Sequence, residues 1–100
     1  MEAFPLTSDS IINVEIPATI SAALGIPRQV RVHGVSVSEV IEELCKDFPE
    51  LKPRLLDDKG EVHRFVNLYV NGVDIRELNG TLTLLKNPSQ LTILSAISGG

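Results

Sequence analysis

Residues 37–48 repeat their apolar side chains at the spacing of an α-helix. An amphipathic helix here limits how the rest of the chain can pack. Its buried side is expected to carry Val37, Val40, Ile41, Leu44 and Phe48. Ser36 and Glu39 fit a capping box, in which the serine oxygen accepts one unpaired amide and the glutamate reaches back to another. Pro49 stops the helix, which is expected over residues 37–47. A lone amphipathic helix must bury its apolar side against another layer.

The other apolar segments alternate between apolar and polar residues, as half-buried strands do. Strands are predicted at residues 11–16, 29–33, 65–70, 73–78 and 91–94. Asn71-Gly72 is the strongest hairpin-turn signal, because both residues tolerate positive φ. Residues 18–27 contain Gly25 and Pro27 and are expected to form a loop. The predicted fold is therefore α+β, with one main helix packed across a mixed sheet of four or five strands.

The length of 100 residues suits one domain. We expect a flexible arm at residues 1–10, a folded domain at residues 11–95 and a mobile tail at residues 96–100. If the first and last strands pair in parallel, this tail is free at one end of the sheet.

Charge and composition argue against several classes of function. The net charge is −4 and no cluster of Lys or Arg is present, which argues against nucleic-acid binding. The single cysteine, Cys45, allows no intramolecular disulfide, which suits a reducing compartment. The first residues lack the basic start of a signal peptide, and no apolar stretch reaches the roughly 20 residues that span a bilayer. We therefore expect a cytoplasmic protein with no membrane partner.

The end of the sequence carries the strongest functional signal. No charged side chain follows Lys86, and the chain finishes with Gly99-Gly100. Two glycines lack Cβ atoms, so they can thread a narrow channel and bring the terminal carboxylate to a nucleotide in a partner protein. A partner that uses ATP would activate the carboxylate by adenylation. Attack by sulfur would then leave a thiocarboxylate, whereas attack by an amine or a thiol would give a conjugate. This chemistry requires no catalytic residue and no bound cofactor in the chain itself.

The element order and the diglycine end resemble the ubiquitin-like sulfur-carrier family, which includes the molybdopterin synthase small subunit and the thiamin sulfur carrier. Residues 63–71, with the sequence HRFVNLYVN, are most similar to the branch of cysteine-biosynthesis sulfur carriers. The resemblance implies a β-grasp fold and a thiocarboxylate on Gly100. It also implies two partners, an ubiquitin-activating-like adenylyltransferase/sulfurtransferase and a downstream synthase that accepts the sulfur in cysteine or molybdopterin biosynthesis. Gly99, Ser98 and Ile97 would thread the tail into the activating enzyme.

Three alternatives remain open at this point. In the first, the chain is a protein modifier conjugated to lysines through Gly100. In the second, it is the small subunit of a molybdopterin synthase. In the third, it is an ubiquitin-like interaction domain whose tail is incidental. Isopeptide-linked adducts, stable co-purification with a larger subunit, or indifference to deletion of the two glycines would distinguish them.

An apolar patch on the outer side of the sheet is the candidate partner interface. Phe65 and Tyr69 are expected to point away from Val66, Leu68 and Val70, and Leu94 away from Leu91 and Ile93. Exposed apolar patches with aromatic residues mark protein interfaces. In the alternative interpretation, the N-terminal arm, with Phe4, Pro5 and Leu6, covers Phe65 or Tyr69.

The remaining candidate residues are interpreted as structural. Cys45 is expected to pack on the flank of the helix rather than to react. His33 and His63 are thirty residues apart and form no metal-binding motif. Asp57-Asp58 precedes Lys-Gly and is expected to form a turn.

Overall fold

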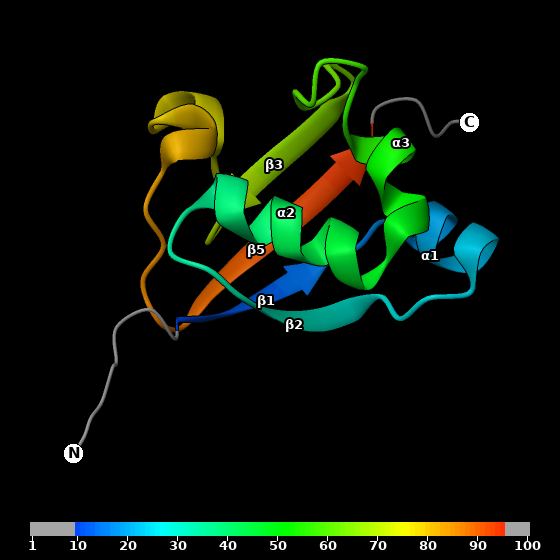
Figure 1. Cartoon of the computed structure of the whole chain (residues 1–100). Coiled ribbons are helices and arrows are strands. Elements are labelled where there is room, and N and C mark those ends of the chain that lie inside the picture. Colours follow the sequence, from blue (N-terminus) through cyan, green and yellow to red (C-terminus); the bar gives the residue numbers. More distant parts are fainter. Residues whose placement is uncertain (1–9, 96–100) are drawn as a thin grey trace.

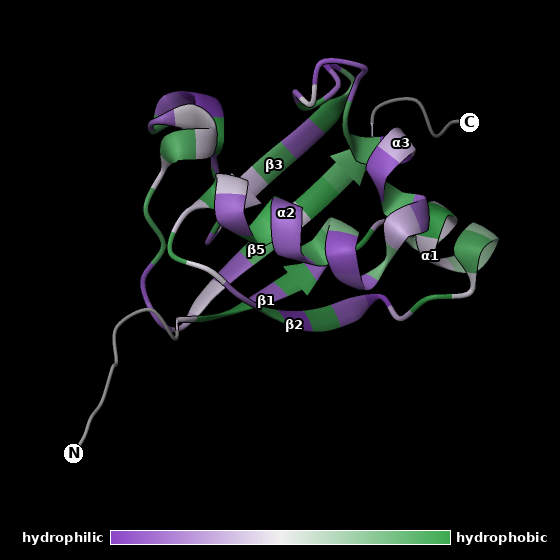
Figure 2. Ribbon diagram, viewed as in Figure 1, coloured by the Kyte–Doolittle hydropathy of each residue, from purple (hydrophilic) through white to green (hydrophobic). Residues whose placement is uncertain are grey.

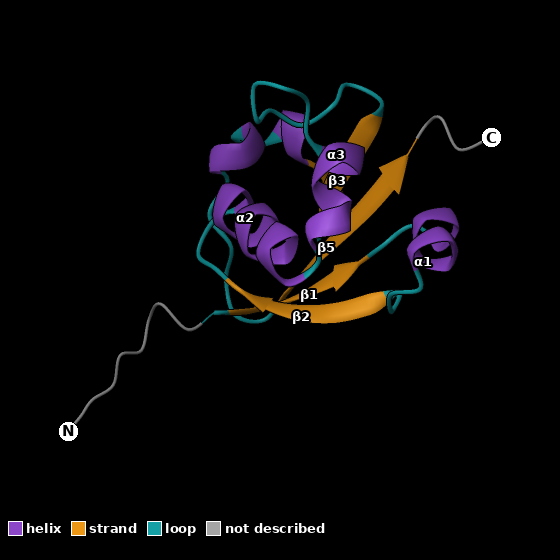
Figure 3. Ribbon diagram, turned by 45° about the vertical axis from the view of Figure 1, so that its right-hand side comes forward, coloured by secondary structure: helices purple, strands orange, loops and turns teal. Residues whose placement is uncertain are grey.

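The computed structural model of the chain describes residues 10–95, which form one sheet with its longest helix across one side (Figure 1). The strands lie in the order β2-β1-β5-β3-β4. Their bounds are β1 (Ile11–Glu15), β2 (Gln29–His33), β3 (Val66–Val70), β4 (Val73–Asp74) and β5 (Ser89–Ser95). β1 and β5 pair in parallel, and the other neighbours pair antiparallel. Figure 3 shows the long helix α2 (Val37–Asp47) across one face of this sheet. The predicted mixed sheet with one main helix is confirmed.

The core lies between the sheet and α2. Alternate strand residues point into it, and the green and purple bands along the strands in Figure 2 follow this alternation. The strands contribute the almost fully buried side chains of Ile12, Val14, Leu68, Leu91 and Ile93. The helix contributes Val37, Val40, Ile41 and Leu44. Each such side chain stabilises the fold by about 1.5–3 kcal/mol relative to an exposed one, so burial of these two faces holds the layers together.

The start of α2 is capped as predicted. The Glu39 amide donates to Ser36 Oγ at 3.2 Å, and Glu39 Oε1 accepts from the Val35 amide at 3.2 Å. After Phe48, the short helices η2 (Pro49–Leu51) and α3 (Lys52–Leu55) bring Leu51 and Leu55 into the core.

The predicted loop at residues 18–27 is wrong in its first part, because Ala18–Leu24 forms the helix α1. This helix follows Pro17, and no side chain caps its N-terminus. It ends at Gly25, whose φ of 68° is left-handed and whose amide donates to the Ser21 carbonyl at 2.9 Å. At seven residues, it is too short to show a helical period in the sequence.

The predicted strand at residues 73–78 is also wrong beyond Asp74. The Asn71-Gly72 turn is present, with φ of 49° and 88°, and it leads into a β4 of only two residues. Asp74 Oδ1 then accepts from the Arg76 amide at 2.8 Å and caps the short helix η3 (Ile75–Glu77). Ile75 is buried by this bend, so burial of one side chain ends the strand. A second short helix, η4 (Gly80–Leu82), follows.

Among residues 10–95, no helix combines the length and the apolar character that crossing a bilayer requires.

Candidate functional site

The tail residues that the sequence analysis singled out lie outside the described residues. They are Ile97, Ser98, Gly99 and Gly100. The described chain stops at Ser95, which pairs with Val66 at the start of β3. The tail therefore begins where β5 ends, beside the first residue of β3.

The face of the sheet opposite α2 presents an apolar pair close to this point. We call it the open face and define it by Asn67, Tyr69, Thr92 and Leu94. Leu94 lies opposite Asn67, and Tyr69 lies opposite Thr92, so Leu94 and Tyr69 are diagonal neighbours. The Leu94 side chain is 47% exposed and Tyr69 is half-buried. The sequence analysis expected both residues on this face, and the register places them there.

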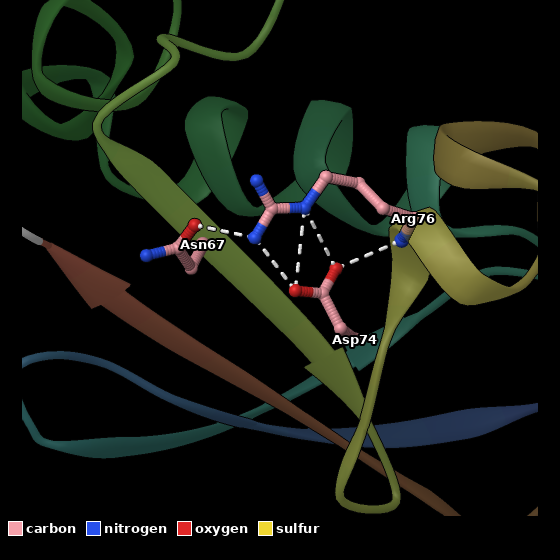
Figure 4. A network of polar contacts seen from close by, with 3 residues as sticks. All are labelled: Asn67, Asp74 and Arg76. Atoms are coloured by element: carbon pink, nitrogen blue, oxygen red, sulfur yellow. Dashed lines mark hydrogen bonds and ion pairs between the residues drawn. The ribbon is translucent and has the colours of Figure 1, made fainter.

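A polar cluster borders the open face on the β4 side (Figure 4). The Arg76 guanidinium donates from Nη2 to Asp74 Oδ2 at 2.7 Å and from Nε to Asp74 Oδ1 at 3.1 Å. The same Nη2 reaches Asn67 Oδ1 at 3.2 Å. Hydrogen bonds from the Arg76 side chain, and then from its backbone amide, hold the pKa of Asp74 below its usual value. Arg76 makes these hydrogen bonds although its side chain is 70% exposed.

A second polar group borders the open face on the β1 side. Arg28 Nη2 donates to Glu15 Oε2 at 3.3 Å, and Gln90 Nε2 donates to Glu15 Oε1 at 3.4 Å. Glu15 pairs with Thr92 of β5. Leu94 and Tyr69 thus lie between two sets of polar side chains. An apolar centre with a polar rim is the usual build of a protein–protein interface.

Phe65, the third residue expected in the interface, has a different environment. It lies in the turn before β3, half-buried, and packs against the core cluster. Its ring stacks on His63 with centroids 4.6 Å apart and an angle of 15° between the planes. Its role in an interface remains a prediction, and its contacts with the core indicate that it also stabilises the fold.

The other candidate residues have structural environments. Cys45 is half-buried and packs against the core, and burial raises the pKa of its thiol. Asp57 Oδ1 accepts from the amides of Lys59 and Glu61 at 2.8 and 3.0 Å, so the predicted turn is confirmed. Within residues 10–95, no group of three or more potential metal ligands is present.

The sequence analysis missed the cluster of Asn67, Asp74 and Arg76. Its signal is an Asp-x-Arg triplet that begins two residues after the Asn-Gly turn. In a continuous strand, Asp74 and Arg76 would share one face, so the sequence alone gives no reason to expect the carboxylate to cap a helix. The cluster forms because β4 stops at Asp74.

Comparisons with known proteins agree with this architecture. The chain matches the ThiS family over residues 14–100. It is 34% identical over 91 residues to the sulfur carrier protein CysO of Mycobacterium tuberculosis, which covers 89% of this chain and 98% of that protein.

Solved structures give the same result. One chain in the crystal structure of the Amycolatopsis orientalis BexX/CysO complex is 34% identical, with a TM-score of 0.78 and coverage of 89% of this chain and 99% of that one. The small archaeal modifier protein 1 from Methanosarcina acetivorans is 31% identical, with a TM-score of 0.78 and coverage of 92% and 98%. These likenesses confirm the predicted ubiquitin-like β-grasp fold.

Proposed function

The chain belongs to the ThiS family, and from this premise we propose that it is a sulfur carrier whose C-terminal carboxylate, on Gly100, is the working group. The observation that supports this proposal most directly is that the family match runs through Gly99-Gly100 to the end of the sequence. The 34% identity to a mycobacterial sulfur carrier protein supports the same function.

The proposed chemistry has two steps. In the first, the Gly100 carboxylate attacks the α-phosphorus of ATP bound by an activating enzyme, which releases pyrophosphate and leaves an acyl adenylate. In the second, a sulfide-level sulfur nucleophile attacks the carbonyl carbon and displaces AMP. The product is a thiocarboxylate that a synthase consumes in cysteine or molybdopterin biosynthesis. The carrier supplies the carbonyl group, and the partner supplies the nucleotide site.

The geometry of the open face suits such a partner. Leu94 precedes Gly100 by six residues, and six extended residues span at most about 20 Å. A partner that docks on Leu94 and Tyr69 must therefore hold its nucleotide within about 20 Å of this contact. We propose that Leu94 and Tyr69 anchor the activating enzyme, that the Arg76 guanidinium adds a charged contact at the rim, and that Ile97, Ser98 and Gly99 enter its channel.

Intact mass spectrometry tests the function. The protein is incubated with host extract, ATP and a sulfide source, and we expect a mass increase equal to the replacement of one oxygen by sulfur, mapped to Gly100. The increase should disappear when Gly100 is deleted. An unmodified protein, in an extract that thiocarboxylates another carrier, would contradict the proposal.

Two variants test the docking surface separately from the chemistry. Leu94→Ser changes the open face, whereas Leu84→Ser changes an exposed leucine beyond the other end of β5. The first variant should slow the ATP-dependent modification and the second should not. Equal rates in both variants would place the contact elsewhere.

Protein modification is the second candidate function. The observation in its favour is the 31% identity to an archaeal protein named as a small modifier. Activation of Gly100 is common to both functions, and they differ in whether sulfur or a lysine amine attacks the adenylate. Isopeptide-linked adducts of this chain in its host would support modification.

A further inference from the structure

A hollow of about 360 Å³ lies between α2 and the turn that follows α3. Part of its lining is apolar, with Ile41 from α2 and with Leu56 and Val62 from the two sides of the turn. Ile41 is almost fully buried, whereas Leu56 and Val62 are half-buried, so some apolar surface is open here. Glu42 and Glu61 also line the hollow. These five residues define what we call the Glu42 pocket.

Backbone hydrogen bonds hold the walls of the Glu42 pocket. In the turn, the Asp57 amide donates to the Glu61 carbonyl at 2.7 Å, and Asp57 Oδ1 accepts from the Glu61 amide at 3.0 Å. On the other side, Thr81 of η4 completes the lining. The Val37 amide donates to the Thr83 carbonyl at 3.0 Å, which ties this segment to the start of α2. Both walls are therefore fixed by contacts of the backbone.

The charges around the Glu42 pocket are negative. Glu42 and Glu61 are exposed, and none of the ion pairs found within residues 10–95 includes either of them. A neighbouring depression shares Glu42 and adds Glu39 and Glu43, of which Glu43 pairs with Lys46 at 3.2 Å. Among the described residues, no Lys or Arg lines either hollow. A concave surface lined by one sign of charge attracts the opposite charge, so the pocket favours a cation.

The apolar walls decide which kind of cation complements these charges. Arginine and lysine side chains lay their methylene stems along apolar surface and keep the charged group at a polar edge. Arginine also carries five N–H donors, which pair with carboxylates in bidentate fashion. A bare metal ion would make no use of apolar walls, and residues 10–95 contain no group of three possible ligands for one. The pocket therefore matches a guanidinium on an aliphatic stem.

We propose that the Glu42 pocket receives an arginine side chain from a partner protein. Leu82, which directly follows Thr81 of the lining, is 74% exposed and offers an apolar contact to the neighbouring residues of that partner. Helix α2 and the open face lie on opposite sides of the sheet (Figure 3). A protein bound at the Glu42 pocket therefore leaves Leu94 and Tyr69 accessible, and this second contact does not depend on the proposed sulfur chemistry.

A peptide titration followed by nuclear magnetic resonance tests this proposal on the full-length protein. The probe is a short peptide, blocked at both ends, in which one arginine lies between two leucines. We expect it to shift the backbone amide resonances of Glu42, Glu61 and Leu82 and to leave those of Tyr69 and Leu94 unchanged. Two matched peptides, with glutamine or glutamate in place of the arginine, should bind at least about threefold more weakly, because they lose the ion pairs.

Variants of the protein locate the contact. Glu42→Gln and Glu61→Gln should each raise the dissociation constant of the arginine peptide by roughly 1.5- to 5-fold, and the double variant should raise it further. Leu82→Ser should weaken binding of the arginine and glutamine peptides alike, because it removes an apolar contact. Glu50→Gln is the matched control, since Glu50 is an exposed glutamate outside the pocket lining, and it should leave the dissociation constant unchanged. Unchanged spectra of the core methyl groups in each variant establish that the fold is intact.

Three results would overturn the proposal. The first is equal binding of the arginine, glutamine and glutamate peptides, or no resonance shifts with any of them at millimolar concentration. The second is binding of free arginine as tight as that of the arginine peptide, which would assign the pocket to a small molecule. The third is the same set of shifts when the protein alone is concentrated, which would assign the pocket to a second copy of the chain.

Discussion

Replacing Gly34 by alanine should destabilise the fold, although such a change often stabilises a protein. Gly34 is buried between β2 and the start of α2, and its φ lies outside the left-handed region. On backbone grounds alone, alanine would add about 0.4–1 kcal/mol of stability. The new Cβ, however, would lie 2.7 Å from Val40 Cγ2 and 3.1 Å from the Val40 amide nitrogen. Overpacking of this kind costs about 1–3 kcal/mol, so we expect a net loss of roughly 0.5–2 kcal/mol.

Val40 is the reason for this cost, and a double-mutant cycle isolates it. The Val40 side chain is fully buried and β-branched, so it has little freedom to turn away. Val40→Ala alone should cost about 1.6 kcal/mol for two lost methyl groups, plus a cavity term. In that background the 2.7 Å contact is gone, so Gly34→Ala should become at least about 0.5 kcal/mol less costly.

Equilibrium unfolding in urea gives the free energy of unfolding of the wild type, the two single variants and the double variant. With a slope of about 1–3 kcal/mol per molar urea, a loss of 1 kcal/mol lowers the midpoint by roughly 0.3–1 M. Gly60→Ala is the control, because its φ of 82° is strained for alanine while no atom lies within 4 Å of the new Cβ. Its cost should not depend on Val40. A Gly34→Ala protein as stable as the wild type, or a cycle with no coupling, would refute the packing argument.

Three further predictions follow from the surface and the ionisable groups. Leu94→Ser should change the free energy of unfolding by no more than about 0.5 kcal/mol, because Leu94 is 47% exposed. Phe65→Ser should lower the free energy of unfolding by more, because Phe65 packs against the core. Equal losses for the two variants in thermal or urea unfolding would contradict this difference. The pKa of Asp74 is lowered by its bonds to Arg76, so its ionised form should stabilise the fold above the unfolded-state pKa of about 3.9, and this contribution should be lost as the pH falls through the lower folded-state pKa. Asp74→Asn should therefore reduce stability at neutral pH and weaken its dependence on acid, and a titration midpoint for Asp74 at or above about 3.9 in carbon-detected resonance spectra would show the reasoning to be wrong. Burial raises the pKa of the Cys45 thiol, so a smaller fraction of the thiol is ionised at neutral pH. Cys45 should therefore react more slowly with a disulfide reagent in the native protein than in the protein unfolded in urea. Equal rates would rule out protection by the fold.

Local patterns in the sequence predicted much of the architecture. The residues on the buried face of α2, the Ser36–Glu39 cap and the Asn71-Gly72 turn each depend on neighbours within a few positions, and all three are present. The alternation in β1, β3 and β5 likewise identified the buried face of each strand.

The errors occur where distant contacts override local preference. Ala18–Leu24 is a helix that has no capping side chain and is too short to show a period, and Ile20 is buried within it. Ile75 turns into the core and so stops β4 at Asp74. Phe65 continues the alternation of β3 in sequence, yet it lies in the turn before that strand and stacks on His63.

The sequence by itself determined the period of α2 and of the strands β1, β3 and β5, the hairpin turn and the diglycine end, because these are properties of adjacent residues. Tertiary structure alone decided which side chains border the open face and which leucines are left exposed. The parallel pairing of β1 with β5 puts the first residue of β1 and the last residue of β5 at opposite ends of the sheet. The end of β4 brings Asp74 and Arg76 beside Asn67, and the Leu85–Val35 bond leaves Leu84 exposed. The physical reason is that each of these contacts joins residues far apart in the chain or depends on a bend forced by burial, which no local period encodes.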